Sequence, residues 1–254
     1  MDWDQVLKAN GVDRYDRNAR LYPAFLCLLP IFSVVALWMP QVWTLLGGLV
    51  ALAVGCGLTF FLAQLVRYLG RQVEKKLGKQ VGRAHSAVLL SHSDVRITAG
   101  TKARYHQYLA KHGIKVPDAR AEADDPAVAK QSFRSAIDWL LVHTRSQAKT
   151  SMLLNENIAY GFRRNLLGVK PVALVLLVLA LLGNLYLLLV RDDQARGVAA
   201  GLVELLLLLA LVVWLFIVRA SFVEDASLAY AQRLFDLCDG AQATPRNAKK
   251  KANT

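Results

Sequence analysis

The sequence predicts an all-α membrane protein with four transmembrane helices, arranged as two hairpins with a small helical cytosolic domain between them. Hydrophobic residues make up 55% of the 254-residue chain and charged residues only 20%. Soluble domains are usually about one quarter charged. The charges are also spread unevenly, because the stretch 21–66 contains none and the stretch 172–218 contains five. The apolar residues are therefore concentrated in two long blocks.

Each block is long enough for two membrane crossings, since about 20 apolar residues cross a hydrocarbon core of roughly 30 Å. In the first block we expect a crossing over 21–39, a turn at Pro40 and Gln41, and a return over 42–68. A signal peptide is the alternative for the first crossing, because basic residues precede it. That run is longer than a usual signal sequence and lacks a small-residue cleavage site.

The second block predicts a crossing over 172–190, a turn over 191–196 and a return over 197–218. Pro171 is expected near the first turn of the third helix, where its missing N–H costs little. The chain then divides into an N-terminal cytosolic segment, two hairpins, a cytosolic domain, and a C-terminal helix with a basic tail: 1–20, 21–68 and 171–218, 69–170, and 219–254.

Lysine and arginine predict the orientation. The region 67–170 contains nineteen basic residues and eight acidic ones, whereas the two short turns together contain only two basic residues. Because basic segments stay on the cytoplasmic side, we expect both termini and the central region to be cytosolic.

The basic central region allows three interpretations: a surface for anionic lipid headgroups, a site for nucleic acid or a nucleotide, and a signal for topology alone. Juxtamembrane clusters of basic residues attract the anionic cytoplasmic leaflet. Such a cluster follows the second predicted span directly: Arg67, Arg71, Lys75, Lys76, Lys79 and Arg83.

Helical patterns fill the middle of this region. The stretch 101–112 places Tyr105, Tyr108 and Leu109 on one side and precedes a glycine suited to a left-handed cap. Asp125 followed by proline is a helix start signal, and the apolar residues after it recur at helical spacing. The stretch 88–97 is less periodic and is expected to be a loop or a short strand.

The stretch 152–167 should form a helix leading toward the third span. Five of its residues form an unusual motif: Glu156, Asn157, Tyr160, Gly161 and Asn165. A glycine inside a helix costs about 1 kcal/mol relative to alanine, so Gly161 predicts a close helix contact.

This motif resembles an uncharacterised family of bacterial inner-membrane proteins that share an ENxxYGFRRN-like segment before a membrane span. The resemblance covers the central region and the third span, and includes Thr101 to His106 and Thr144-Arg145. It implies a membrane location and a bacterial origin. It implies no chemistry, because the family has no assigned function.

Five basic residues are candidates for binding the phosphate of a lipid headgroup or a nucleotide: Arg163, Arg164, Lys170, Arg104 and Lys102. A guanidinium offers a planar fork of donors that suits phosphate. The alternative is structural, with Glu156 pairing with Arg163 or Arg104 to fasten the cytosolic helices together.

The sequence predicts no catalytic residue, cofactor or metal site. The strings G-x-S-x-G, G-x-x-x-x-G-K-[ST] and H-E-x-x-H are absent. The three cysteines form no C-x-x-C pair, and no two of the five histidines are four residues apart. We therefore expect a protein that is not an enzyme.

The spans contain one predicted polar pair. Glu204 is the only charged residue expected inside a span, and an unpaired charge in hydrocarbon costs at least about 2.5 kcal/mol. Asn184 and Glu204 are each about ten residues from the middle of the turn between them, so they should lie at the same depth and share a hydrogen bond. The functional alternative is a carboxyl group that lines an ion or proton path.

Small residues in the second and fourth spans predict close helix packing: Gly47, Ala51 and Gly55, and Gly197 and Gly201. The packing is expected within one chain, with homo-oligomerisation as the alternative.

Three functions are compatible with these features. The leading hypothesis is a non-enzymatic membrane protein whose cytosolic domain binds a ligand, an anionic lipid or a protein partner and couples it to the spans. The second is a membrane-perturbing or pore-forming effector of a bacterial phage-defence system. The third is a membrane-tethered binder of nucleic acid or a nucleotide.

Overall fold

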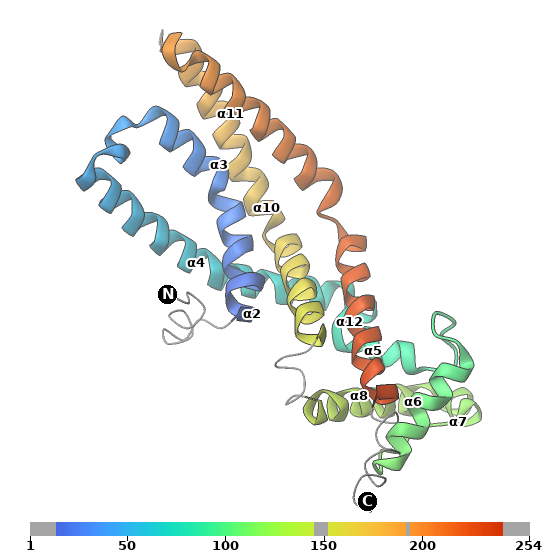
Figure 1. Cartoon of the computed structure of the whole chain (residues 1–254). Coiled ribbons are helices and arrows are strands. Elements are labelled where there is room, and N and C mark those ends of the chain that lie inside the picture. The colour runs from blue at the N-terminus through green and yellow to red at the C-terminus, as the bar shows by residue number, and fades with distance from the viewer. Residues whose placement is uncertain (1–13, 145–151, 192–193, 241–254) are drawn as a thin grey trace, which may run out of the picture. The chain divides into compact units, whose positions relative to one another are not determined.

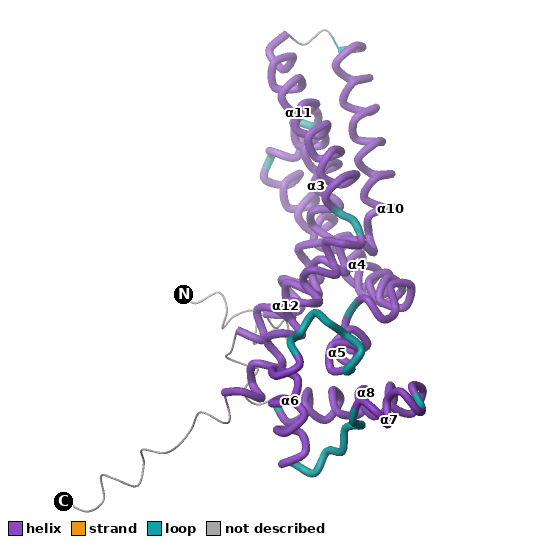
Figure 2. The backbone as a smooth tube through the Cα atoms, turned by 90° about the vertical axis from the view of Figure 1, so that its right-hand side faces the viewer, coloured by secondary structure: helices purple, strands orange, loops and turns teal. Residues whose placement is uncertain are grey.

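The computed structural model of the protein describes residues 14–144, 152–191 and 194–240 (Figure 1). Every regular element within these ranges is a helix, and none of them is a strand (Figure 2). Four of the helical segments are long and apolar enough to cross a membrane. The predictions of an all-α fold and of four candidate spans are confirmed.

The chain forms two compact units, each built from two segments. Unit 1 comprises residues 1–76 and 158–223, and unit 2 comprises residues 77–157 and 224–254. The candidate spans supply most of unit 1, and shorter helices supply most of unit 2.

The helix that contains the first candidate span begins before the predicted crossing. A continuous helical stretch runs through α2 (Arg14–Asp16), the π-helix η1 (Arg17–Leu21) and α3 (Tyr22–Trp38). The helix therefore includes the charged turns before residue 21, which an apolar window leaves out, and the predicted crossing over 21–39 corresponds to its later part. A 3-10 turn, η2 (Pro40–Trp43), follows α3.

The second candidate span lies within α4 (Leu45–Leu77), a helix of 33 residues that continues past the predicted end of the crossing at residue 68. At 1.5 Å per residue the helix is about 50 Å long, compared with roughly 30 Å for the hydrocarbon core. Its last turns are therefore a basic extension beyond the apolar part. The helix ends where Gly78 adopts a φ of +55°, a left-handed conformation that glycine adopts readily.

The third span is part of one helix, α10 (Met152–Val190), with 39 residues. Pro171 lies in its interior, so the expectation that it marks the first turn of a separate helix is wrong. Proline removes one backbone hydrogen bond, and helices packed against neighbours tolerate that loss. The turns on both sides of Pro171 keep the helix continuous.

The fourth span comprises α11 (Gln194–Val212) and a π-helical end, η4 (Val213–Ile217). Val218 has a ψ of 86°, which ends the helix. The chain then enters α12 (Ala220–Gly240), which corresponds to the predicted C-terminal helix. The predicted basic tail lies outside the described residues.

The core of unit 1 is formed by α3, the middle of α4, α10 and α11. Its most buried residues are small or aliphatic, which allows the helices to approach closely: Ala24, Cys27, Val66, Val169, Ala173 and Leu177. Within this unit the buried apolar residues described on α4 begin at Leu62, and the large apolar residues from Leu49 to Phe61 are exposed.

The core of unit 2 joins the later part of α12 to three helices: α5 (Gly82–Leu90), α6 (Ala99–Lys111) and α8 (Pro126–His143). A short helix, α7 (Ala119–Asp124), contacts α8. The helices predicted over 101–112 and from residue 126 are confirmed.

Several local predictions for unit 2 also agree with the structure. Phe133 is buried in the core together with the apolar residues that follow it at helical spacing. Asp125 accepts hydrogen bonds from the backbone N–H groups of Ala127 and Val128, as expected for a residue that starts a helix. Of the stretch 88–97, the first residues belong to α5 and the rest is a loop without a strand.

Candidate functional site

A row of basic side chains follows the apolar part of α4. Arg67, Arg71 and Lys75 recur at i, i+4 and i+8 and therefore share one side of the helix. All three side chains are exposed. We call these three residues the basic stripe. None of them forms an ion pair or side-chain hydrogen bond with another residue in the described parts of the chain.

The acidic residue nearest in sequence to the basic stripe pairs with an arginine of α10 instead. Glu74 accepts a hydrogen bond from Nη1 of Arg164 at 2.6 Å, and this pair is partly buried. The carboxylate of Glu74 is therefore neutralised by α10. The basic stripe keeps its charge available to a ligand.

Arg164 is engaged within the protein on several sides. Besides the ion pair with Glu74, its guanidinium lies 5.5 Å from the centre of the Tyr160 ring and donates weakly to Oδ1 of Asn165. Arg164 is half-buried. These contacts favour the structural interpretation of this arginine.

Arg163 is also held by the protein. Its Nη1 donates to the carbonyl oxygen of Phe222 at 3.2 Å, and its guanidinium lies 4.4 Å from the centre of the Phe222 ring. Arg163 therefore fastens α10 to the start of α12 within unit 1. The partner of Arg163 in the structure is Phe222, whereas the sequence suggested Glu156.

Lys170 binds the end of the fourth span. Its Nζ donates to the carbonyl oxygens of Leu215 and Val218, at 3.1 and 2.8 Å. These carbonyls belong to the C-terminal turn of a helix, which leaves acceptors unsatisfied and has a negative partial charge. The ammonium group of Lys170 donates hydrogen bonds to these carbonyls and brings a positive charge to this end of the helix. Its contacts are therefore structural.

Asn165 is fully buried and satisfies a carbonyl group that the sequence leaves open. Its Nδ2 donates to the carbonyl oxygen of Ala19 at 2.6 Å. In an α-helix this carbonyl would accept from the residue four positions later, which is Pro23 and has no N–H. Asn165 therefore ties α10 to the start of the first span.

Two glycines outside the predicted packing motifs form a close contact between helices in unit 1. A Cβ atom added to Gly168 would lie 2.7 Å from the backbone N of Gly70. A Cβ added to Gly70 would meet the side chain of Asn165. The backbones of α4 and α10 therefore touch at these two residues. Gly161, Asn165 and Gly168 recur at i, i+4 and i+7, a spacing that could have revealed this face.

The close contact predicted at Gly161 is present. A Cβ atom there would lie 2.6 Å from Oη of Tyr15 and 3.1 Å from Cβ of Ala19. No side chain larger than hydrogen fits without a shift, so the contact explains a glycine inside the helix.

The other predicted packing residues behave differently. A Cβ at Gly47 would collide with the carbonyl of Gln41 in the adjacent turn, and one at Gly55 would make ordinary contact with Phe32 at 3.6 Å. Ala51 is exposed. Added Cβ atoms at two further glycines would meet nothing within 4 Å: Gly197 and Gly201. Of these four glycines, Gly55 is the one whose added Cβ atom would contact another span of this chain.

The structure brings Asn184 and Glu204 together. Nδ2 of Asn184 donates to Oε2 of Glu204 at 2.8 Å and to the carbonyl of Ala200 at 3.0 Å. A third partner, which sequence reasoning missed, is Trp38, whose Nε1 donates to Oδ1 of Asn184 at 2.8 Å. Asn184 therefore joins α3, α10 and α11, and it is fully buried.

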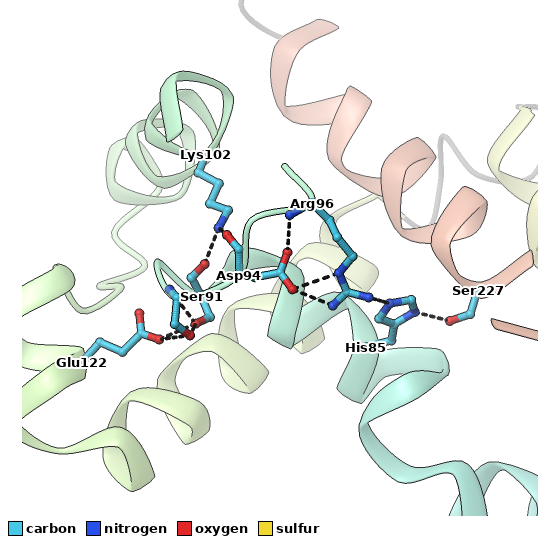
Figure 3. A network of polar contacts seen from close by, with 8 residues as sticks. His85, Ser91, Asp94, Arg96, Lys102, Glu122 and Ser227 are labelled. Atoms are coloured by element: carbon cyan, nitrogen blue, oxygen red, sulfur yellow. Dashed lines mark hydrogen bonds and ion pairs between the residues drawn. The ribbon is translucent and has the colours of Figure 1, made fainter. Parts of the chain in front are cut away.

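Unit 2 contains a polar network around the loop between α5 and α6 (Figure 3). Lys102 is only 4% exposed, and its Nζ donates to the carbonyl oxygens of Ser91 and Asp94. On the other side of the loop, Glu122 accepts from the hydroxyl of Ser91 and from the backbone N–H of His92. The network fixes the loop, which favours a structural role for Lys102.

Burial and hydrogen bonding shift the pKa values of these groups. Burial lowers the pKa of Lys102. Burial alone would raise the pKa of Asp94, but hydrogen bonds from the side chain and backbone of Arg96 outweigh it, and the pKa lies below its ordinary value. Hydrogen bonds from Ser91 and His92 lower the pKa of Glu122 in the same way, against the opposing effect of burial.

The network also contains a serine–histidine pair that is not arranged for catalysis. Nδ1 of His85 lies 3.0 Å from Oγ of Ser227, and Nε2 of His85 lies 2.7 Å from Nη1 of Arg96. A guanidinium only donates, so Nε2 accepts and Nδ1 donates its proton to the serine oxygen. The imidazole therefore cannot remove the serine proton. Both side chains are also buried, at 2% and 0% exposure.

The remaining predicted residues lie outside these clusters. Arg104 is exposed and donates to Oγ1 of Thr101 at 3.3 Å. Glu156 and Asn157 are half-buried on α10. Among the described residues, no three His, Cys, Asp or Glu side chains gather in a way that could hold a metal ion.

Comparison of the chain with protein families, with curated proteins and with solved structures gives no match. The resemblance of residues 154–171 to a bacterial membrane family stays a prediction.

Proposed function

We propose that this chain is a non-enzymatic, four-span protein of the bacterial inner membrane that binds anionic phospholipid headgroups at the cytosolic surface. The basic stripe of α4 carries the proposal. It presents exposed, unpaired cations directly after a span, whereas Arg163, Arg164 and Lys170 are already held by partners within unit 1.

The contacts at the charged ends of the spans support a topology of two hairpins with both termini inside. A residue just before the first span contacts one just before the third span. A residue just after the second span also contacts one just before the third. These contacts are Ala19 with Asn165 and Gly70 with Gly168. Lys170 likewise reaches Val218, at the end of the fourth span. These contacts support a common side for the four basic ends, as the positive-inside rule requires.

The expected affinity follows from the number of exposed charges. Each basic residue near an anionic leaflet contributes about 1 kcal/mol. Removing two of them should therefore cost about 2 kcal/mol, which corresponds to roughly a 30-fold loss of affinity. The effect should weaken at high salt, because exposed charges are screened.

Native mass spectrometry of the purified protein tests the proposal. Detergent-solubilised protein is titrated with phosphatidylglycerol and separately with phosphatidylcholine. We expect the double variant R67Q/R71Q to lose most of its preference for phosphatidylglycerol, by about 30-fold in apparent affinity. The wild-type protein should keep that preference.

The matched control removes two other exposed basic residues, also four apart on one helix. Lys130 and Arg134 lie on α8 in unit 2 and follow no span. K130Q/R134Q changes the net charge equally and should bind phosphatidylglycerol like wild type. Equal affinities for the two double variants would show that overall charge, and not the basic stripe, attracts the lipid.

A further inference from the structure

An apolar groove lies between α3 and α4 in unit 1. It has a volume of about 680 Å³ and is lined by residues of both helices, including Phe25, Phe32 and Ala36 on α3 and Leu52, Gly55 and Phe60 on α4. The first part of α4 diverges from α3 (Figure 1). Leu52 and Phe60 are each 63% exposed. The groove is therefore open along the apolar part of unit 1.

The two ends of this groove differ in charge. One end is at Val42, in the turn between the helices, and the stretch 21–66 around it contains no charged residue. The other end is at Leu21 and Phe60. Arg67 follows Phe60 by seven residues, which is two helical turns or about 10 Å on nearly the same face.

We propose that this groove binds one acyl chain of an anionic phospholipid from the inner leaflet, with the phosphate held by Arg67 and Arg71. This inference rests on the proposed function and assigns its ligand a specific place. The apolar lining takes the chain, and the exposed cations beyond the end of the groove take the headgroup. The charge asymmetry of the groove fixes which leaflet supplies the lipid.

The dimensions of the groove fit an acyl chain. From Leu21 to Ala36 it extends about 22 Å along α3, which exceeds the roughly 15 Å of one leaflet's hydrocarbon. A helix of a second copy, about 10 Å wide, would occupy roughly 1,700 Å³ over that length. The groove offers about 680 Å³, which suits a single narrow chain better than a helix.

Filling the groove tests the proposal. Gly55→Phe places a ring in the groove, where a Cβ atom itself makes only ordinary contact with Phe32. The matched control is Gly201→Phe on α11, where a Cβ atom meets nothing within 4 Å. Native mass spectra of both full-length variants are recorded with phosphatidylglycerol and phosphatidylcholine. We expect G55F to retain at least 10-fold less phosphatidylglycerol than G201F.

The wild-type protein provides a second test that needs no folded variant. Cys56 lines the groove and is exposed, whereas Cys27 and Cys238 are buried. Phosphatidylglycerol should slow the alkylation of Cys56 by N-ethylmaleimide several-fold, as followed by peptide mapping. Phosphatidylcholine should slow it much less.

The outcomes separate the groove from the basic stripe. One outcome is that R67Q/R71Q loses phosphatidylglycerol, G55F retains as much as G201F, and alkylation of Cys56 is not slowed. The assignment of the acyl chain to the groove is then wrong, and the proposed function stands. If R67Q/R71Q binds like wild type, the proposed function fails and the phosphate site fails with it. If G55F changes the oligomeric mass instead of lipid retention, a second copy covers the groove and the lipid proposal is overturned.

Discussion

Replacing Asn184 with leucine should loosen the three-helix junction in the apolar part of unit 1. Asn184 accepts from the indole N–H of Trp38 and donates to Glu204 and to the carbonyl of Ala200. Leucine is similar in size but makes none of these hydrogen bonds. The carbonyl of Ala200 can still accept a backbone hydrogen bond within α11. The lost hydrogen bonds therefore affect mainly Trp38 and Glu204.

The magnitude follows from the two side-chain bonds between helices. Such bonds average about 0.6 kcal/mol in a membrane protein, with a maximum of about 1.7. Two of them give about 1 to 3 kcal/mol. Trp38 is 3% exposed, and a buried donor left without a partner costs a further 1 kcal/mol or more. We therefore expect N184L to lose about 2 to 4 kcal/mol of unfolding free energy.

Steric trapping in bicelles measures the free energy of unfolding directly. Glu204→Gln should lose less than about 0.5 kcal/mol, because the amide oxygen still accepts from Asn184. Tyr186→Leu is the control, since this polar side chain on the same helix is 63% exposed. An N184L protein as stable as Y186L would refute the reasoning, as would an E204Q protein as unstable as N184L.

Three further predictions address packing, pH and topology. Gly168→Ala should lose about 1 to 3 kcal/mol by overpacking, because its Cβ would meet the backbone of Gly70; Gly197→Ala should not lose stability in the same unfolding assay. Burial lowers the pKa of His106 below its ordinary value of 6.5. The stability it contributes is therefore present above pH 6.5 and lost below it, so the melting temperature should fall as the pH drops from 6.5 to 5, and less so in H106Q. A cysteine placed at Asp118 should react with a membrane-impermeant maleimide only after cell lysis. Labelling in intact cells would show that the predicted orientation is wrong.

The positions of the spans could be predicted because they depend on composition over about 20 residues. Their ends could not. α4 continues to Leu77 and α10 starts at Met152, because a helix may continue through charged residues once neighbours pack against it. The same limit applies to Pro171, whose position inside α10 depends on whether the preceding turns stay helical.

The polar pair in the spans was predictable from depth alone, because the turn fixes the register of Asn184 against Glu204. Trp38 was not predictable as their partner, since it comes from a helix whose position relative to α10 is set by packing. The basic stripe is visible in the sequence as a row of spaced cations. The sequence does not show whether these cations are free to bind a ligand. Only the contacts show that Arg163, Arg164 and Lys170 are engaged while Arg67 and Arg71 are not.

The sequence by itself determined the all-helical class, the four apolar spans and the location of the charge, because each depends on residue type within a short window. The tertiary structure decided which cations are paired, which glycines touch another helix, and where α3 and α4 leave a groove between them. These features depend on distances between residues far apart in the chain. Gly70 and Gly168 show the difference, because it is the crossing of α4 and α10 that leaves no room for a side chain at either position.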